Sequence, residues 1–211
     1  MFSRARAGFT LVELMVVIAI LGLLVSVLAF AVTRHFTKAN ADLDKVNMHK
    51  LFDALQQAGT NPSYTKRFND KDNRDKSGRE FFEFLFQAGV LDGNDLNSVV
   101  SLGGGDAPAE RDSVGKDMKL DAGSCSFTAP KLGEFRQLLT GKERTVLFTF
   151  NSRNAHNYDS IGYGMLVAWS DGEVDYLTED DAASKYQISA AEWADPTQLY
   201  GKKKPFEHTF E

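Results

Sequence analysis

The sequence places a single carboxylate inside an otherwise apolar segment. Residues 9–32 form a run of 24 residues in which Glu13 is the only ionisable side chain. A carboxylate in hydrocarbon costs roughly 2.5–3.5 kcal/mol at the centre of a bilayer and less near its edge. Because that cost calls for compensation, Glu13 is a candidate functional residue. The alternative is an acid that the membrane edge merely tolerates.

A nucleophilic site would depend on Cys125, which is the only cysteine of the chain. His156 and Asp159 are the residues that could form a thiol, imidazole and carboxylate arrangement with it. Cys125 lies in the sequence GSCSFT, however, and no local motif of a catalytic cysteine surrounds it. We therefore expect no enzyme activity. A single cysteine also excludes an intramolecular disulfide.

Metal binding is weakly indicated. The four histidines lack zinc-ligand spacing; they are His35, His49, His156 and His208. The sequence NDKDNRDKSG fails as an EF-hand, because counting from Asp70 puts Asp75 at the glycine position and Phe81 at the glutamate position. A group of acids near the end of the chain could bind calcium, although a solvated edge is the simpler interpretation: Asp171, Glu173, Asp175, Glu179, Asp180 and Asp181. We expect no cofactor, with calcium in this region as the alternative.

Nucleic-acid and nucleotide binding are not indicated. The formal net charge is −5, and residues 202–204 form the only basic run in the body of the chain. The positive footprint that nucleic acid requires is therefore lacking. The glycine-rich sequence SLGGGDAPAERDSVG has no following Gly-Lys-Ser or Gly-Lys-Thr, so it predicts a flexible loop rather than a phosphate-binding loop.

The apolar run is long enough to cross a membrane. At about 1.5 Å per residue, a helix over residues 9–32 measures about 36 Å, against a hydrocarbon core of about 30 Å. A cleaved secretory signal is the alternative, since Arg4 and Arg6 precede the run and Ala29-Phe30-Ala31 offers a small-residue cleavage site. The apolar region of such a signal normally spans about 7–15 residues without an acid. We expect a transmembrane helix that is retained.

The helical pattern continues beyond the apolar run. Two apolar stripes have helical spacing: Phe36, Ala39, Leu43 and Val46, and then Met48, Leu51, Leu55 and Ala58. Gly59 and the pair Asn61-Pro62 form a stop signal. The sequence therefore predicts one helix from Phe9 to Ala58, about 75 Å long at about 1.5 Å per residue.

Residues 60–211 predict one globular head of mixed structure. Residues 60–78 are polar and indicate a loop, after which Ser77 could cap a helix over GREFFEFLFQAGVLDG. Gly89 or Gly93 would end this helix, and its buried stripe would be Phe81, Phe82, Leu85, Phe86 and Val90.

The second half of the head is expected to be rich in β-structure. Residues 144–152, RTVLFTFNS, are dense in β-branched and aromatic residues. Residues 162–178 place Asp171-Gly172 between two such runs, which predicts a hairpin. The expected fold class is α+β: a long N-terminal helix, transmembrane in its first half, with an antiparallel β-sheet packed on its second half.

The segment GFTLVELMVVIAILGLL, residues 8–24, resembles the N-terminal motif of type IV pilins and of the pseudopilins of type II secretion. The short leader MFSRARA precedes it. The resemblance implies that a prepilin peptidase cuts after Gly8, on the cytoplasmic side of the membrane, and methylates the new amine of Phe9.

The resemblance also implies a division of the chain into four parts. These are the leader, the transmembrane and assembly half of the helix, the exposed half of the helix and the pilin-like head: residues 1–8, 9–32, 33–59 and 60–211. The first half of the helix would pack against other subunits and the second half against its own head.

Processing would give Glu13 a partner. The amine created at Phe9 lies four residues before Glu13, at helical i,i+4 spacing, and can compensate a carboxylate in a low dielectric. The resemblance implies that this amine belongs largely to a neighbouring subunit. The charge pair would then select the axial stagger of subunits in a filament.

The expected function is structural: a pseudopilin subunit of a type II secretion pseudopilus. A type IV pilus or competence subunit is the alternative, followed by a membrane-anchored enzyme or binding module.

The implied partners are other pilin or pseudopilin subunits, the prepilin peptidase and an inner-membrane assembly platform. The implied location is the inner membrane, with a cytoplasmic N-terminus and a periplasmic or extracellular head. Basic residues do not set this orientation, because Arg4 and Arg6 balance Arg34 and Lys38.

Overall fold

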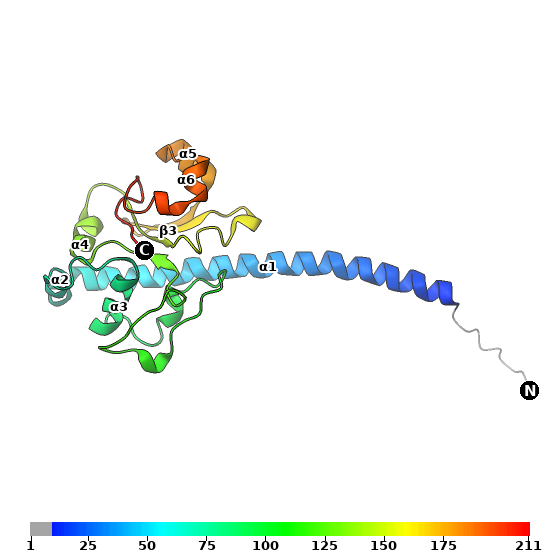
Figure 1. Ribbon diagram of the computed structural model, residues 1–211, viewed down its shortest axis with the longest axis horizontal. Helices are drawn as coiled ribbons and strands as arrows, with labels where there is room; N and C mark the ends of the chain where they lie inside the picture. The colour runs from blue at the N-terminus through cyan, green and yellow to red at the C-terminus, as the bar shows by residue number, and fades with distance from the viewer. Residues whose placement is uncertain (1–9) are drawn as a thin grey trace, which may run out of the picture.

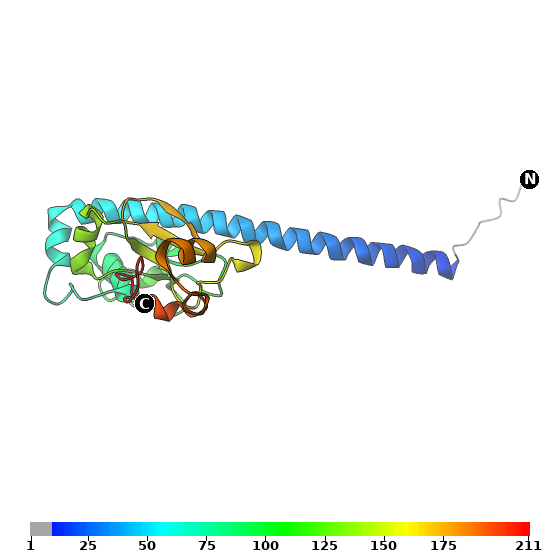
Figure 2. The same cartoon turned by 90° about the horizontal axis from the view of Figure 1, so that it is seen from above.

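A computed structural model describes residues 10–211 (Figure 1). The longest element is α1 (Leu11–Thr60), and all other helices and strands gather around its C-terminal half. Figure 2 shows that the N-terminal half of α1 stands clear of the head. This arrangement, a long apolar helix followed by a head with an antiparallel sheet, confirms the predicted α+β fold class.

Helix α1 ends two residues beyond the predicted position, at a junction that starts another helix. The N–H of Asn61 donates to the carbonyl of Ala58, while its side chain accepts from the N–H of Ser63. Pro62 is the first residue of α2 (Pro62–Phe68). The prediction of a loop over residues 60–78 is therefore wrong for α2. Asn61 caps the helix, proline suits its first position, and the buried Phe68 anchors its end.

The next predicted helix is confirmed as α3 (Gly78–Ala88). Ser77 occupies the N-cap position, but its side chain makes no capping hydrogen bond. Gly89 ends the helix with φ 73°, a left-handed conformation that suits glycine. Most of the predicted stripe is buried, namely Phe81, Phe82, Leu85 and Phe86, whereas Val90 is half-buried.

Four antiparallel strands form one sheet in the order β1-β2-β3-β4. They are β1 (Phe127–Thr128), β2 (Val146–Phe150), β3 (Met165–Trp169) and β4 (Val174–Leu177). The predicted hairpin is confirmed between β3 and β4, where Gly172 has φ 93°. The two-residue β1 was not predicted, since it is too short to carry a periodic pattern.

The sheet separates two apolar clusters. Alternate residues of β3 belong to different clusters. Leu166 and Ala168 belong to the larger cluster, which also contains residues of α1 and α3. Val167 and Trp169 belong to the smaller cluster. Figure 1 shows α5 and α6 on the side of the sheet opposite α1. The remaining helical elements are α4 (Leu132–Thr140), α5 (Glu179–Tyr186), α6 (Ala190–Ala194), η1 (Leu96–Val99), η2 (Arg111–Ser113), η3 (Asp159–Ile161) and η4 (Pro196–Gln198).

Only one of the two predicted stripes of α1 packs against the head. The second stripe is buried: Met48, Leu51, Leu55 and Ala58. The first stripe is exposed, with Phe36 at 68%, Leu43 at 51% and Val46 at 47% of their full surface. The head therefore covers one side of α1 and leaves an apolar side open.

A buried carboxylate fastens α1 to the head. Asp44 is fully buried and accepts hydrogen bonds from the Ser101 hydroxyl (2.6 Å), the Leu102 N–H (2.9 Å) and the Tyr158 hydroxyl (2.6 Å). Burial raises the pKa of Asp44, and the hydrogen bonds oppose that shift. One turn earlier, the Tyr176 hydroxyl donates to the carbonyl of Ala41 (2.9 Å). These contacts join α1 to the glycine-rich segment, to the start of η3 and to β4.

Replacing Asp44 by alanine should destabilise the head. The substitution leaves the buried hydroxyls of Ser101 and Tyr158 and the part-buried N–H of Leu102 without an acceptor, so we expect the free energy of unfolding to fall by about 2–4 kcal/mol. Urea unfolding of the full chain in mild detergent, followed by the fluorescence of Trp169 and Trp193, measures this change. Asp42→Ala, on the exposed side of the same helix, is the control and should shift stability by less than about 0.5 kcal/mol. Equal effects of the two substitutions would contradict the anchoring role of Asp44.

Candidate functional site

The N-terminal half of α1 presents an apolar surface that its own chain does not cover. Every large hydrophobic side chain between residues 11 and 32 is exposed, from 42% for Val32 to 74% for Phe30. Apolar surface of this extent requires lipid or another protein against it. Within the described residues, α1 is the one helix long and apolar enough to span a bilayer. It fits a single-pass membrane anchor.

Glu13 lies at the N-terminal end of this surface and caps its own helix. Its carboxylate accepts from the backbone N–H of Thr10 (2.8 Å) and from the Thr10 hydroxyl (2.9 Å). In return, the Thr10 hydroxyl accepts from the backbone N–H of Glu13 (3.2 Å). This reciprocal pair is a capping box, which satisfies donors at the helix start. The carboxylate is thus aimed back toward the start of the helix.

Sequence reasoning overlooked this capping box, although the signal was present. Thr10 and Glu13 have the Thr-x-x-Glu spacing of the motif directly ahead of an apolar run. The structure therefore gives Glu13 a local capping role, and its pairing with the amine of Phe9 stays a prediction. The predicted cleavage site, Gly8 and Phe9, lies outside the described residues, so the structure does not place the amine that Glu13 is expected to meet.

The three residues considered for nucleophilic chemistry do not form an activated site. His156 and Asp159 are paired, with 2.9 Å between Nδ1 and Oδ2. Cys125 is buried, its Sγ donates to the carbonyl of Phe127 (3.6 Å), and burial raises the pKa of its thiol to about 12. A thiol held protonated in this way is a poor nucleophile near neutral pH.

Ion pairs within the protein hold Asp171, Glu173 and Asp175, three of the acids considered for calcium. Arg144 binds Asp171 (2.7 Å) and Glu173, and Lys45 binds Asp175 (2.9 Å). The other three acids, Glu179, Asp180 and Asp181, lie in the first turn of α5, where the helix dipole favours negative charge. Among residues 10–211, no group of three metal-ligating side chains converges on one point.

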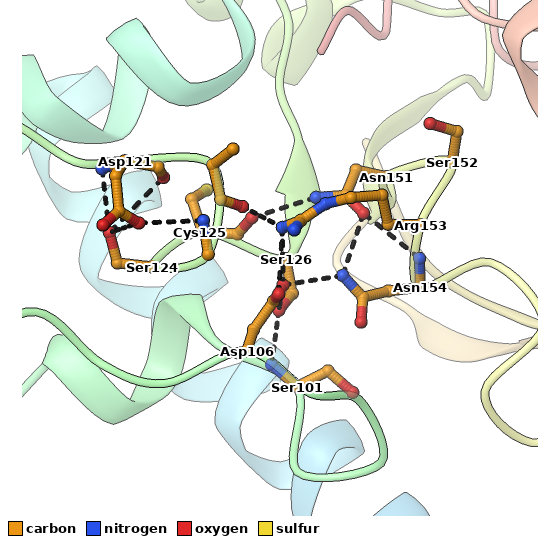
Figure 3. Close-up of polar contacts among 12 residues, drawn as sticks. Ser101, Asp106, Asp121, Ser124, Cys125, Ser126, Asn151, Ser152, Arg153 and Asn154 are labelled. Carbon is orange, nitrogen blue, oxygen red and sulfur yellow. Dashed lines mark hydrogen bonds and ion pairs between the residues drawn. The ribbon is translucent and has the colours of Figure 1, made fainter.

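A second polar cluster holds the glycine-rich segment against the sheet (Figure 3). The Asp106 carboxylate, 7% exposed, accepts from the Ser126 hydroxyl (2.7 Å), the Asn154 amide (2.8 Å) and Arg153 (2.9 Å). The Ser126 hydroxyl in turn accepts from the backbone N–H of Ser101 (2.8 Å). Because these groups satisfy one another, the cluster has a structural role. Together with Asp44, it fixes a segment for which sequence predicted only a flexible loop.

Comparison with known proteins identifies the N-terminal segment. The family model described as the prokaryotic N-terminal methylation motif matches residues 3–29. This match is consistent with a type IV pilin or pseudopilin, as the sequence resemblance indicated. No curated protein and no solved structure matches the chain.

The Cys125 thiol should resist alkylation while the head is folded. Because burial keeps the thiol protonated and covered, iodoacetamide at about pH 8 should modify it slowly in the native chain and completely after unfolding in urea. Intact mass measured over time reports the rate in each state. A single-cysteine variant, Cys125→Ser with Ser113→Cys on the exposed η2, is the control and should react quickly without urea. Rapid native modification of Cys125 would contradict its assigned environment.

Proposed function

We propose that the protein is a structural subunit that assembles into a helical filament through the N-terminal half of α1. The observation that carries this proposal is the combination of the methylation motif with an uncovered apolar helix over the same residues. Proteins of this pilin-like kind are structural rather than enzymatic. The buried Cys125 thiol and the paired acids of the head fit a role without catalysis.

Processing would begin with cleavage after Gly8. The leader, residues 1–8, would be removed by a prepilin peptidase, and the new N-terminal amine of Phe9 would be methylated. Residues 9–32 would then serve first as a membrane anchor and later as the assembly surface. Residues 33–59 would connect that surface to the head of residues 60–211.

Glu13 would change its principal partner after cleavage. In the described chain its carboxylate binds the N–H and hydroxyl of Thr10. A free amine at Phe9 would place a cation close to this cap. In a filament, where the helices of neighbouring subunits pack together, the carboxylate of one subunit would bind the amine of the next. Since an unpaired charge is costly in a buried helical bundle, subunits would adopt the stagger that makes this pair.

Within this class we favour a pseudopilin of type II secretion, located in the inner membrane with its N-terminus in the cytoplasm and its head in the periplasm. The partners would be other pseudopilins, the prepilin peptidase and an inner-membrane assembly platform. A pilus or competence subunit would use the same N-terminal chemistry. Deleting the gene distinguishes the two, because loss of protein secretion indicates a pseudopilus, whereas loss of surface pili or of DNA uptake indicates a pilus system.

The processed protein should begin at Phe9 and carry one methyl group on its amine. We expect this product when the chain is expressed with a cognate prepilin peptidase, and the uncut precursor when the peptidase is absent. Intact-mass analysis and N-terminal peptide sequencing identify the start. Gly8→Leu should block cleavage, because the peptidase site loses its glycine, and serves as the control. A start at Val32 would instead establish a conventional secretory signal.

Glu13→Leu should be processed normally but should fail to assemble. The substitution keeps Gly8 and increases hydrophobicity, so insertion and cleavage remain. The Phe9 amine would lose its buried partner, at a cost of up to about 3–5 kcal/mol. We expect filament yield to fall at least about tenfold, measured by shearing and immunoblotting with the variant as the only copy. Glu13→Gln, which keeps the shape but not the charge, should fail in the same way.

Thr10→Ala separates the two roles of Glu13. This variant removes the hydroxyl of the capping box and keeps the carboxylate. If assembly depends on charge pairing, Thr10→Ala should form filaments at close to the wild-type level. Loss of assembly in Thr10→Ala equal to that in Glu13→Leu would assign Glu13 to helix capping alone, and normal assembly of processed Glu13→Leu would remove it from assembly altogether.

A further inference from the structure

A basic pocket lies where α1 leaves the apolar segment and meets the head. Its volume is about 440 Å³. One wall is formed by α1, and the other by the end of η3 and the loop that follows it. The lining residues are Phe30, Ala31, Arg34, His35, Lys38, Ile161 and Tyr163. We refer to this site as the basic pocket.

The cations of the basic pocket have no partner within the described chain. Arg34 and Lys38 are separated by one helical turn and His35 lies three residues before Lys38, and all three line the pocket. No aspartate or glutamate lines the pocket. Eight lysines and arginines of residues 10–211 form ion pairs, and neither Arg34 nor Lys38 is among them; His35 forms none either. The pocket is therefore suited to an anion supplied from outside.

The position of the basic pocket along α1 matches the surface of a bilayer. Arg34 is the first ionisable residue after the apolar run, and Lys38 lies about 9 Å beyond Val32 at about 1.5 Å per residue. Helical side chains tilt toward the N-terminus, which here is the side of the hydrocarbon. Phe30 and Ala31 supply an apolar floor on that same side. The pocket is thus apolar toward the membrane and cationic toward water.

The head supplies a fixed second wall to the basic pocket. Figure 1 shows that the loop around η3, drawn in yellow, extends further along α1 toward the N-terminus than the rest of the head. Tyr163 in this loop packs on Tyr176, with ring centroids 4.9 Å apart, and the Tyr176 hydroxyl binds the backbone of α1 at Ala41. Tyrosine is also typical of the membrane interface. The wall is therefore held in place without a ligand.

We propose that the basic pocket binds the phosphate of an anionic phospholipid in the leaflet next to the head. The phosphodiester would lie among Arg34, His35 and Lys38, and the glycerol and upper acyl chains would contact Phe30 and Ala31. A lipid fits this combination better than a soluble phosphate, because Phe30 and Ala31 give the pocket an apolar floor on the side of the hydrocarbon. The proposal requires that residues 9–32 span a bilayer, but it does not depend on filament assembly.

Native mass spectrometry of the full chain in detergent tests this proposal. Phosphatidylglycerol and phosphatidylcholine are added at equal concentration, and the bound fraction of each is measured. The wild-type chain should prefer phosphatidylglycerol. Arg34→Gln with Lys38→Gln should weaken that preference about 25-fold, or about fivefold for each cation removed. Every variant keeps the same leader, so Arg4 and Arg6 contribute equally throughout.

Two control variants separate a pocket from general attraction to charge. Lys50→Gln with Lys116→Gln removes two exposed lysines elsewhere and should leave the preference unchanged. Thr33→Arg with Arg34→Gln keeps the net charge and depth but moves the cation about 100° around the helix, so the preference should fall about fivefold. The intrinsic fluorescence of each variant confirms that its head is folded.

Three results would overturn the proposal. The first is an unchanged preference in Thr33→Arg with Arg34→Gln, which would mean that the lipid responds to charge density alone. The second is an equal loss in the lysine control. The third is displacement of phosphatidylglycerol by millimolar glycerol phosphate, which would identify a soluble phosphate as the ligand. None of these results bears on filament assembly, so failure here leaves the proposed function standing.

Discussion

One uninterrupted helix has to satisfy two different surroundings, and the rest of the structure follows from that constraint. Over residues 11–32, α1 exposes only side chains suited to lipid or to another apolar helix, apart from the acid near its start. Over residues 41–59 the same helix is the spine of the head. The helix passes from its exposed apolar part to its buried part within a few turns. Arg34, Lys38 and the buried Asp44 lie in or beside those turns. Glu13 thus lies at the start of α1, and Arg34, Lys38 and Asp44 lie where the helix reaches the head.

Two of the carboxylates of α1, Glu13 and Asp44, illustrate how context decides the role of an acid. Glu13 is exposed, and it satisfies donors at the helix start. Asp44 is buried, and it accepts from three groups that lie far away in the sequence. Because the carboxylate of Glu13 is exposed, another molecule can reach it. Asp44 cannot leave its position without stranding three donors, so it holds the head against the helix.

The sequence was sufficient for features that repeat or that depend on neighbouring residues. The long helix follows from apolar spacing, and the hairpin follows from Asp171-Gly172. Even the missed capping box and α2 had local signals, at Thr10 and at Asn61. Asp44 is different, because its partners Ser101 and Tyr158 are 57 and 114 residues away. Its one clue is that it continues the buried stripe between Ala41 and Met48, where an exposed acid would not be expected. The basic pocket likewise joins α1 to a distant loop, which no local pattern predicts.

The continuity of α1 also has a mechanical consequence. Its backbone hydrogen bonds run without a break from Leu11 to Thr60, and the head grips it only along the C-terminal half. A tensile load applied to the head therefore enters the helix through all the contacts of this half, including those of Asp44, and travels along the axis toward Glu13. No hinge along this path would absorb the extension. An axial movement of the head is therefore transmitted by the rigid helix to its N-terminal end, and a movement of that end is transmitted to the head.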